Sequence, residues 1–164
     1  FKSIRLEVSK GKFEDVDVEK VVKQIEESDI QVLANYIYGL PGDTIKSIHD
    51  TFELSLKLNT LGWNTYAAMA LPGSQLYKDA LEKNIDLPIK YSEFSFHSYD
   101  TKPLPTETLK AGEILKLRDD HFHLYFSNKN FLNKIKNKFG QNAVDNINSM
   151  LKVRLKRKVI EENL

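Results

Sequence analysis

Two segments of this chain combine a short, nearly continuous hydrophobic run with a proline–glycine stop. The first run covers residues 30–38 and ends at the sequence GLPG of residues 39–42. The second covers residues 63–71 and ends at Pro72 and Gly73. Runs rich in β-branched and aromatic residues that stop at such breakers indicate strands, and their near-continuous hydrophobicity predicts burial on both faces.

Helical patterns lie before, between and after these two strands. Apolar residues recur at helical spacing from Asp17, a suitable N-cap, to about residue 28. A second helix follows Asp43 or Thr44 and ends near residues 59–60, and a short third one follows Ser74. Strands that alternate with helices require crossover connections and therefore a parallel sheet.

The fold that this order predicts is an α/β fold, a partial TIM-type (β/α) barrel with parallel strands. A complete barrel takes about 250 residues, whereas the repeat here occupies only residues 1–83. Residues 84–105 are predicted to be an irregular connecting loop. Residues 106–164 are predicted to be an α-helical C-terminal extension with three helices, over residues 106–127, 131–139 and 142–162.

Composition restricts the chemistry. The chain has no cysteine, which excludes a disulfide framework, a thiolate nucleophile and a self-contained iron–sulfur site. Its four histidines are predicted to be structural or exposed, and His121 and His123, two apart on a helix, point to different faces and cannot jointly chelate a metal. No apolar run is long enough for a membrane helix and no signal peptide is evident, so a cytoplasmic protein without a membrane partner is expected.

Charge is unevenly distributed along the chain. Residues 129–164 carry nine Lys or Arg against three Asp or Glu. The last predicted helix has a basic run between Lys152 and Lys158, which could contact a nucleic-acid backbone or an acidic protein surface. A solvated helix face is the favoured interpretation, because Met150, Leu151, Leu155 and Val159 form a stripe that would face the core.

The loop at residues 39–43 is a candidate ligand site. It follows a strand and precedes a helix, which places it at the carboxyl edge of a parallel sheet, where α/β proteins bind ligands. It matches neither a Walker A loop nor the dinucleotide fingerprint. A turn that merely reverses the chain is the alternative.

Three motifs in order resemble the second half of a radical S-adenosylmethionine (SAM) barrel. They are VSKGKF at residues 8–13, NYIYGLPGDT at residues 35–44 and LPGSQLY at residues 71–77. The tail, with YFSN at residues 125–128 and KFG at residues 138–140, is similar to extensions on B12-binding radical SAM proteins. This resemblance implies SAM and a four-iron, four-sulfur cluster as cofactors, and it raises cobalamin as a further one.

The resemblance also implies roles for individual residues. Lys10 corresponds to a basic residue that reaches the methionyl carboxylate of SAM, with a solvent lysine as the alternative. Asn35 stands where relatives often have an Asp that binds the ribose hydroxyls. Ile37 would contact adenine, the backbone near Met69 would bond the adenine edge, and Gly39 belongs to the cofactor-binding loop. For Ile37 and Met69, core packing is the alternative.

The resulting hypothesis is a fragment of a radical SAM enzyme, inactive alone, that contributes SAM and substrate contacts. Members of this family hold the cluster on a C-x3-C-x2-C loop, which is not in this sequence. The partner would be a missing N-terminal half of the same chain, and an uncovered strand edge would favour edge-strand dimers of the fragment. The substrate is not readable. The alternative is a non-catalytic scaffold or interaction module that uses the basic C-terminal helix; nucleic acid is an unlikely partner.

Overall fold

The sheet has two parallel strands, β1 (Leu33–Tyr38) and β2 (Gly62–Ala67), in the computed structural model, which describes residues 15–162. Asn35 lies opposite Asn64, and Tyr38 lies opposite Ala67. One further hydrogen bond, from the Ala68 amide to the Tyr38 carbonyl at 2.8 Å, extends the pairing. Both strands are shorter than predicted, and after β2 the chain turns at once, with the Leu71 amide bonded to the Met69 carbonyl.

The first helices begin where the sequence predicts their caps. They are α2 (Val18–Glu27), α3 (Ile45–Leu58) and α4 (Gln75–Glu82). Asp17, Thr44 and Ser74 each accept a hydrogen bond from a backbone amide of the first turn. Thr44, rather than Asp43, is the cap of α3, and Ser47 returns the bond by accepting from the Thr44 amide. Each cap satisfies a backbone amide that would otherwise have no partner within its helix.

The second half of the chain is mostly helical. Its elements are the short 3₁₀ helix η1 (Tyr91–Phe94), α5 (Ala111–Phe126), α6 (Lys129–Phe139), α7 (Gln141–Met150) and α8 (Lys158–Glu161). The prediction of one helix over residues 142–162 was wrong, because residues 151–157 are not helical. Arg157 occupies a buried site against α5, and the Lys158 amide donates to the Tyr99 carbonyl. These tertiary hydrogen bonds are incompatible with one continuous helix from α7 to α8.

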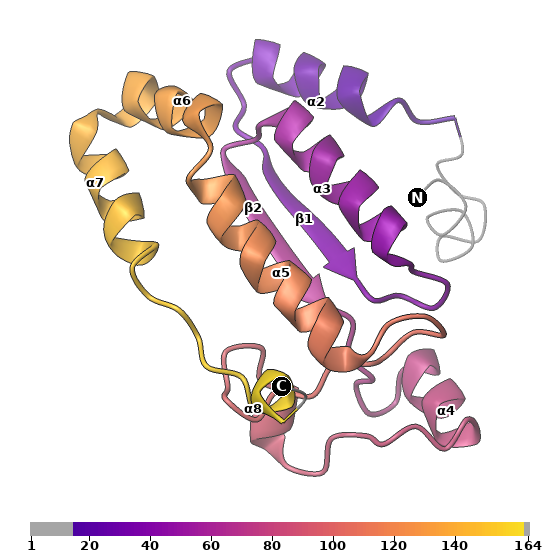
Figure 1. The fold of residues 1–164 in the computed structure, drawn as a ribbon. Coiled ribbons are helices and arrows are strands. Elements are labelled where there is room, and N and C mark those ends of the chain that lie inside the picture. The colour runs from indigo at the N-terminus through magenta and orange to yellow at the C-terminus, as the bar shows by residue number, and fades with distance from the viewer. Residues whose placement is uncertain (1–14, 163–164) are drawn as a thin grey trace.

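Helices α3 and α5 cover one face of the sheet (Figure 1). Tyr38 and Trp63 point into this side and are almost fully buried. They belong to one hydrophobic core that also includes Ile48 and Phe52 of α3, Ile114, Leu115 and Tyr125 of α5, and Phe131 of α6. The core therefore joins the β/α portion to helices of the expected C-terminal extension.

No barrel is present in the part of the chain that the structure describes, so the prediction of a partial TIM-type barrel was wrong. Residues 15–162 form a small mixed α/β domain with a single two-stranded sheet. After α4 the chain does not add another strand, and α5 instead packs against β2 on the face that α3 already covers. A barrel requires a series of tilted strands that closes on itself, and two strands cannot form one.

Among residues 15–162, no helix or strand covers the opposite face of the sheet, and a contact between Phe96 and Tyr66 shields part of it. Leu33 is 62% exposed and Ile37 is 50% exposed on β1. The prediction that the first strand is buried on both faces was therefore wrong. The near-continuous hydrophobicity arises because apolar residues occupy both faces, although only one is covered.

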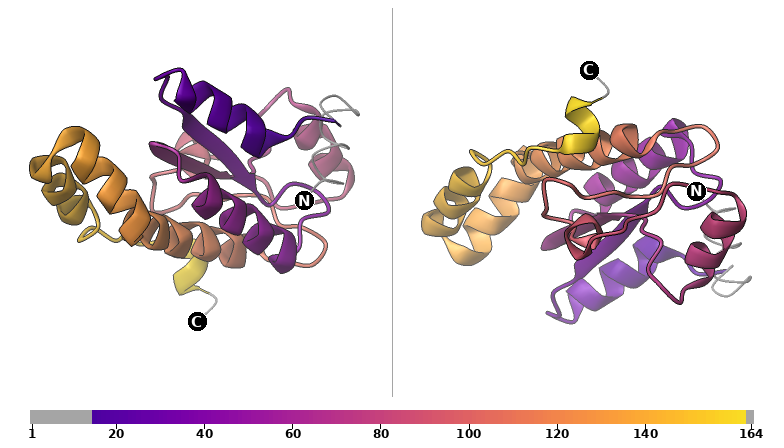
Figure 2. Two further views of the ribbon diagram at one scale, coloured as in Figure 1. Left: turned by 90° about the horizontal axis from the view of Figure 1, so that it is seen from above. Right: turned by 90° about the horizontal axis from the view of Figure 1, so that it is seen from below.

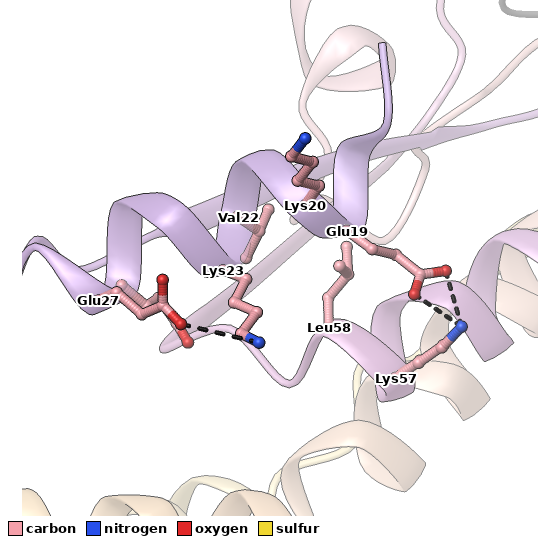
Figure 3. A pocket seen from close by; sticks show the side chains of 8 residues that line it. Glu19, Lys20, Val22, Lys23, Glu27, Lys57 and Leu58 are labelled. Carbon is pink, nitrogen blue, oxygen red and sulfur yellow. Dashed lines mark hydrogen bonds and ion pairs between the residues drawn. The ribbon is translucent and has the colours of Figure 1, made fainter.

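The remaining helices lie around this central unit. Helices α6 and α7 lie beyond the end where the strands begin, and α4 lies beyond the end where they finish (Figures 1 and 2). Helix α2 lies near the C-terminal end of α3, where Glu19 pairs with Lys57 at 2.7 Å (Figure 3). Within residues 15–162, every helix is too short or too polar to cross a bilayer.

Candidate functional site on the open sheet face

The open face of the sheet, defined here by Leu33, Asn35, Ile37, Asn64 and Tyr66, is the candidate site. Because side chains alternate along a strand, these residues lie on the side opposite the core. The register arranges them as cross-strand pairs, with Asn35 opposite Asn64 and Ile37 opposite Tyr66. At the start of the strands, the side chain of Leu33 lies close to Gly62. Polar side chains thus lie between apolar ones.

The centre of the open face is a pair of amides. The Nδ2 atom of Asn64 donates to the Oδ1 atom of Asn35 at 3.2 Å. Within the described residues, the Nδ2 atom of Asn35 and the Oδ1 atom of Asn64 have no hydrogen-bond partner. The pair therefore presents one donor and one acceptor to a ligand, and the mutual bond holds both side chains in place.

An aliphatic and an aromatic side chain lie next to the amides, toward the carboxyl ends of the strands. Ile37 is 50% exposed and Tyr66 is 46% exposed. The Tyr66 ring is held by an edge contact with Phe96, with 5.6 Å between ring centroids. Together, Ile37 and Tyr66 form an exposed apolar surface beside the amide pair, which suits a flat ring with polar edges.

The loop after β1 is held together by Asp43. This buried carboxylate accepts hydrogen bonds from the amides of Gly39 and Leu40 and from the hydroxyl of Ser47, the last at 2.6 Å. Gly39 has a φ of +80°, and a Cβ there would lie 3.0 Å from Ile114. Glycine is thus needed for both conformation and space. The Gly39 amide is used within the loop, which favours the interpretation of this segment as a structural turn.

The structure brings some of the predicted site residues together and separates others. Asn35 and Ile37 share the open face, as their two-residue offset predicts. Gly39 is buried at the carboxyl end of β1. Met69 is half-buried and lies after β2, so its predicted place within the second strand was wrong. Lys10 lies outside the described residues.

A cavity of about 560 Å³ lies beside the Gly39 loop, between α4 and residues 104–107. Its walls include Pro41, Leu76 and Leu104. Two of its charged side chains, Lys83 and Glu107, are 3.9 Å apart, and Glu107 also accepts from the Gly42 amide. The pocket between α2 and α3 is likewise lined by paired charges (Figure 3). Neither cavity contains Asn35 or Ile37.

The described residues do not fit an iron–sulfur cluster or another metal centre. The sequence has no cysteine, and no group of three His, Asp or Glu side chains within residues 15–162 could hold a metal ion. His121 is instead a core residue, with Nδ1 2.9 Å from the Tyr38 hydroxyl and its ring stacked on Phe52. Burial and the neighbouring His49 lower the pKa of His121 to about 4, which keeps the ring neutral.

The sequence analysis did not identify Asn64 and Tyr66 as site residues. These are the two side chains that β2 contributes to the open face. A signal was present, since Trp63 and Thr65 alternate with Asn64 and Tyr66, and one face of such a strand carries the polar residue. The long hydrophobic run obscured that alternation. The strand register was also needed, because it alone shows that Asn64 lies opposite Asn35.

The open face is therefore interpreted from its own side chains, an amide pair beside an aliphatic and an aromatic residue. Compared with models of known protein families, with curated proteins and with solved structures, the chain matches none of them.

Proposed function

We propose that this chain is part of a radical SAM enzyme and that its open sheet face binds the adenosyl group of SAM. The observation that carries this proposal is the Asn35–Asn64 pair on a sheet face that no helix or strand among residues 15–162 covers. The three sequence motifs that resemble radical SAM proteins support the same assignment, because Asn35 and Ile37 belong to the second of them.

The amide pair suits the ribose hydroxyls. A hydroxyl group both donates and accepts a hydrogen bond. The free Nδ2 atom of Asn35 can donate to one oxygen, and the free Oδ1 atom of Asn64 can accept from a hydroxyl. Because Asn is neutral, we expect the contact to be weaker than that of an Asp at this position, since hydrogen bonds to a charged acceptor are about twice as strong as neutral ones.

The neighbouring side chains suit the adenine ring. Ile37 and Tyr66 are each about half exposed and lie opposite each other in the register. A ring placed over them would bury apolar surface, and stacking of a base on an aromatic side chain contributes about 1–3 kcal/mol. In this pose the ribose lies over the amides, while the adenine lies toward the carboxyl ends of the strands.

The cluster would have to come from elsewhere. This chain supplies no thiolate, and Fe–S clusters are held mainly by cysteine thiolates. SAM, when bound, would supply the carbon–sulfur bond that enzymes of this class cleave reductively. The role of the described residues is limited to binding and orienting the nucleoside and to excluding water from one side of it.

Binding of nucleosides tests the site directly. We expect SAM and adenosine to bind the chain in calorimetric titrations, and 2′,3′-dideoxyadenosine to bind at least about fivefold more weakly, because one neutral hydrogen bond contributes about 1 kcal/mol. Asn35→Ala and Asn64→Ala should each weaken adenosine binding by a similar factor. Asn137→Ala, on the exposed surface of α6, is the matched control and should change nothing.

Two results would contradict the assignment at different levels. Equal affinity for adenosine and its dideoxy analogue would contradict the proposed ribose contact and therefore the assignment of the nucleoside site. Separately, the proposal expects a longer polypeptide that adds a cysteine triplet to this chain, and such a polypeptide should release 5′-deoxyadenosine from SAM after anaerobic reconstitution with iron and sulfide. Failure of that assay with an intact nucleoside site would overturn the radical enzyme class alone.

The alternative, a non-catalytic scaffold or interaction module, receives less support. Its basis was a basic C-terminal helix, but residues 151–157 are not helical and Arg157 is buried in an ion pair with Asp119. A nucleic-acid-binding module predicts an affinity for RNA or DNA that falls steeply with salt. Strong, salt-dependent binding to RNA without nucleoside binding would favour this alternative.

A further inference from the structure

A third cavity, called here the α5 pocket, lies between α5 and the C-terminal segment of residues 150–160. Its volume is about 460 Å³, within the range of roughly 300–1,000 Å³ typical of small-molecule sites. One side is formed by α5, with Phe122 and His123, and the other by the C-terminal segment, with Val153, Arg154 and Leu155. None of these residues lies on the open sheet face.

The segment that lines the α5 pocket is anchored by a buried charge cluster. The side chain of Arg157 is only 1% exposed, and its guanidinium donates two hydrogen bonds to the carboxylate of Asp119, at 2.9 and 3.2 Å. It also donates to the carbonyls of residues 96 and 98. Arg118 donates to the same carboxylate at 2.9 Å and lies over the Phe96 ring. The wall formed by residues 150–157 is thus attached to α5 by directional bonds.

The two carboxylates that line the pocket, Asp119 and Asp120, are both paired with cations. Both oxygens of Asp119 accept from arginine, and Asp120 accepts from Lys116 at 2.5 Å. Arg154, in contrast, has no hydrogen-bond or ion-pair partner within residues 15–162. A cation without a partner therefore lies at a cavity whose two carboxylates are already paired.

His123 also lines the pocket, close to Arg154. Partial burial and the nearby guanidinium of Arg154 lower the pKa of His123, despite the presence of Asp119 and Asp120. This shift favours the neutral ring, which can donate one N–H to a ligand.

The apolar part of the pocket is exposed to solvent in this structure. Val153 is 63% exposed and Leu155 is 43% exposed, and Met150 at the start of the segment is 38% exposed. The sequence pattern had placed Met150 and Leu155 in a core-facing stripe, and that prediction was wrong. An occupant with an apolar body would cover them and gain the free energy of that burial.

We propose that the α5 pocket binds a small organic anion with an apolar body, of the aryl-alkyl carboxylate class. Its carboxylate faces Arg154 and His123, and its apolar part contacts Phe122, Val153 and Leu155. The site is independent of the nucleoside site on the open sheet face.

A pair of probes that differ only in charge tests this proposal. We expect 4-phenylbutanoate to bind about fivefold more tightly than the neutral 4-phenylbutanamide, as one partly exposed ion pair supplies at most about that factor. In NMR titrations, the amide shifts that move should belong to residues 116–123 and 150–160. The amides of β1 and β2 should not move.

Variants at the surface of the C-terminal segment separate charge from apolar contact. Arg154→Gln should abolish the preference for the anion while leaving the binding of the amide unchanged. Val153→Asp should weaken both probes. Lys152→Gln removes another exposed cation, which does not line the pocket, and it should leave both affinities as they were. All three side chains are exposed, so the fold should be preserved.

Three results would overturn the proposal. Equal binding of the two probes would show that no cation selects the ligand. An equal effect of Lys152→Gln and Arg154→Gln would show that only the net charge of the tail matters. Shifts confined to the open sheet face, or no saturable shifts at all, would show that the α5 pocket takes no ligand of this class.

Discussion

The two faces of the sheet are made by alternate residues of the same two strands, yet they differ in their surroundings. On the covered face, Tyr38 and Trp63 are at most 2% exposed and contact α3 and α5. On the open face, Ile37 and Tyr66 are about half exposed. We therefore expect the covered face to supply most of the stability, and the open face, which is exposed within residues 15–162, to tolerate substitutions with little effect on folding.

The largest effect should come from truncating the covered face. Trp63 donates its indole N–H to Ser55 at 3.0 Å and stacks on Tyr125. Trp63→Ala should lower the free energy of unfolding by about 4 kcal/mol, through lost burial and a cavity. Tyr66→Ala, the open-face control, should cost less than about 1 kcal/mol. Denaturant unfolding measures both, and similar losses would break the distinction between the faces.

A smaller effect should appear with pH. The folded-state pKa of His121 is about 4, below its ordinary value of 6.5, so the unfolded chain binds a proton that the folded chain excludes. The stabilising contribution is complete above pH 6.5 and is lost as the pH falls toward 4. The loss should amount to about 3 kcal/mol.

The control for this pH dependence is the double variant Tyr38→Phe with His121→Phe. It removes both partners of the buried hydrogen bond and keeps an aromatic ring against Phe52. Unfolding of this variant, followed between pH 7.5 and 4.5, should have a correspondingly shallower pH dependence. An unchanged slope would assign the effect to other groups.

The next effect concerns one hydrogen bond at the end of the covered face. The Tyr125 hydroxyl donates to the Thr60 carbonyl at 2.7 Å, and burial raises the pKa of this tyrosine to about 12. Tyr125→Phe should destabilise the fold by about 1 kcal/mol, because it leaves a buried acceptor without a partner. Tyr91→Phe, on a side chain that is 98% exposed, should have no measurable effect.

The smallest effect should come from an Ile→Ala substitution on the open face, compared with the same substitution in the core. Ile37→Ala should cost less than about 1 kcal/mol, whereas Ile48→Ala, at a residue 1% exposed on α3, should cost about 2–5 kcal/mol. The comparison uses identical chemistry in two environments. If Ile37→Ala were as costly as Ile48→Ala, the open face would have to be buried in solution by an element or a second copy.

Much of the local structure could be predicted from the sequence. The caps Asp17 and Ser74, the breaker after β1 and the two strands follow from residue types that satisfy free backbone amides or permit a positive φ. The candidate site was predicted in part. Asn35 and Ile37 share a face because side chains alternate along any strand, whereas Asn64 and Tyr66 required the register.

Contacts distant in sequence decided the rest. Nothing near Met150 marks the end of α7, and the break makes sense only with Arg157 bonded to Asp119 of α5. Likewise, no local sequence signal predicts that α5 packs on the sheet face that α3 also covers. Because of this packing, the other face is exposed and no barrel forms within the described residues.

The sequence by itself therefore determined the elements, their caps and which side chains share a strand face, because these depend on neighbours one to four residues away. Only the tertiary structure decided which sheet face is covered, where the C-terminal segment lies and which charges remain without partners. Those outcomes depend on the burial and pairing of residues that are far apart along the chain.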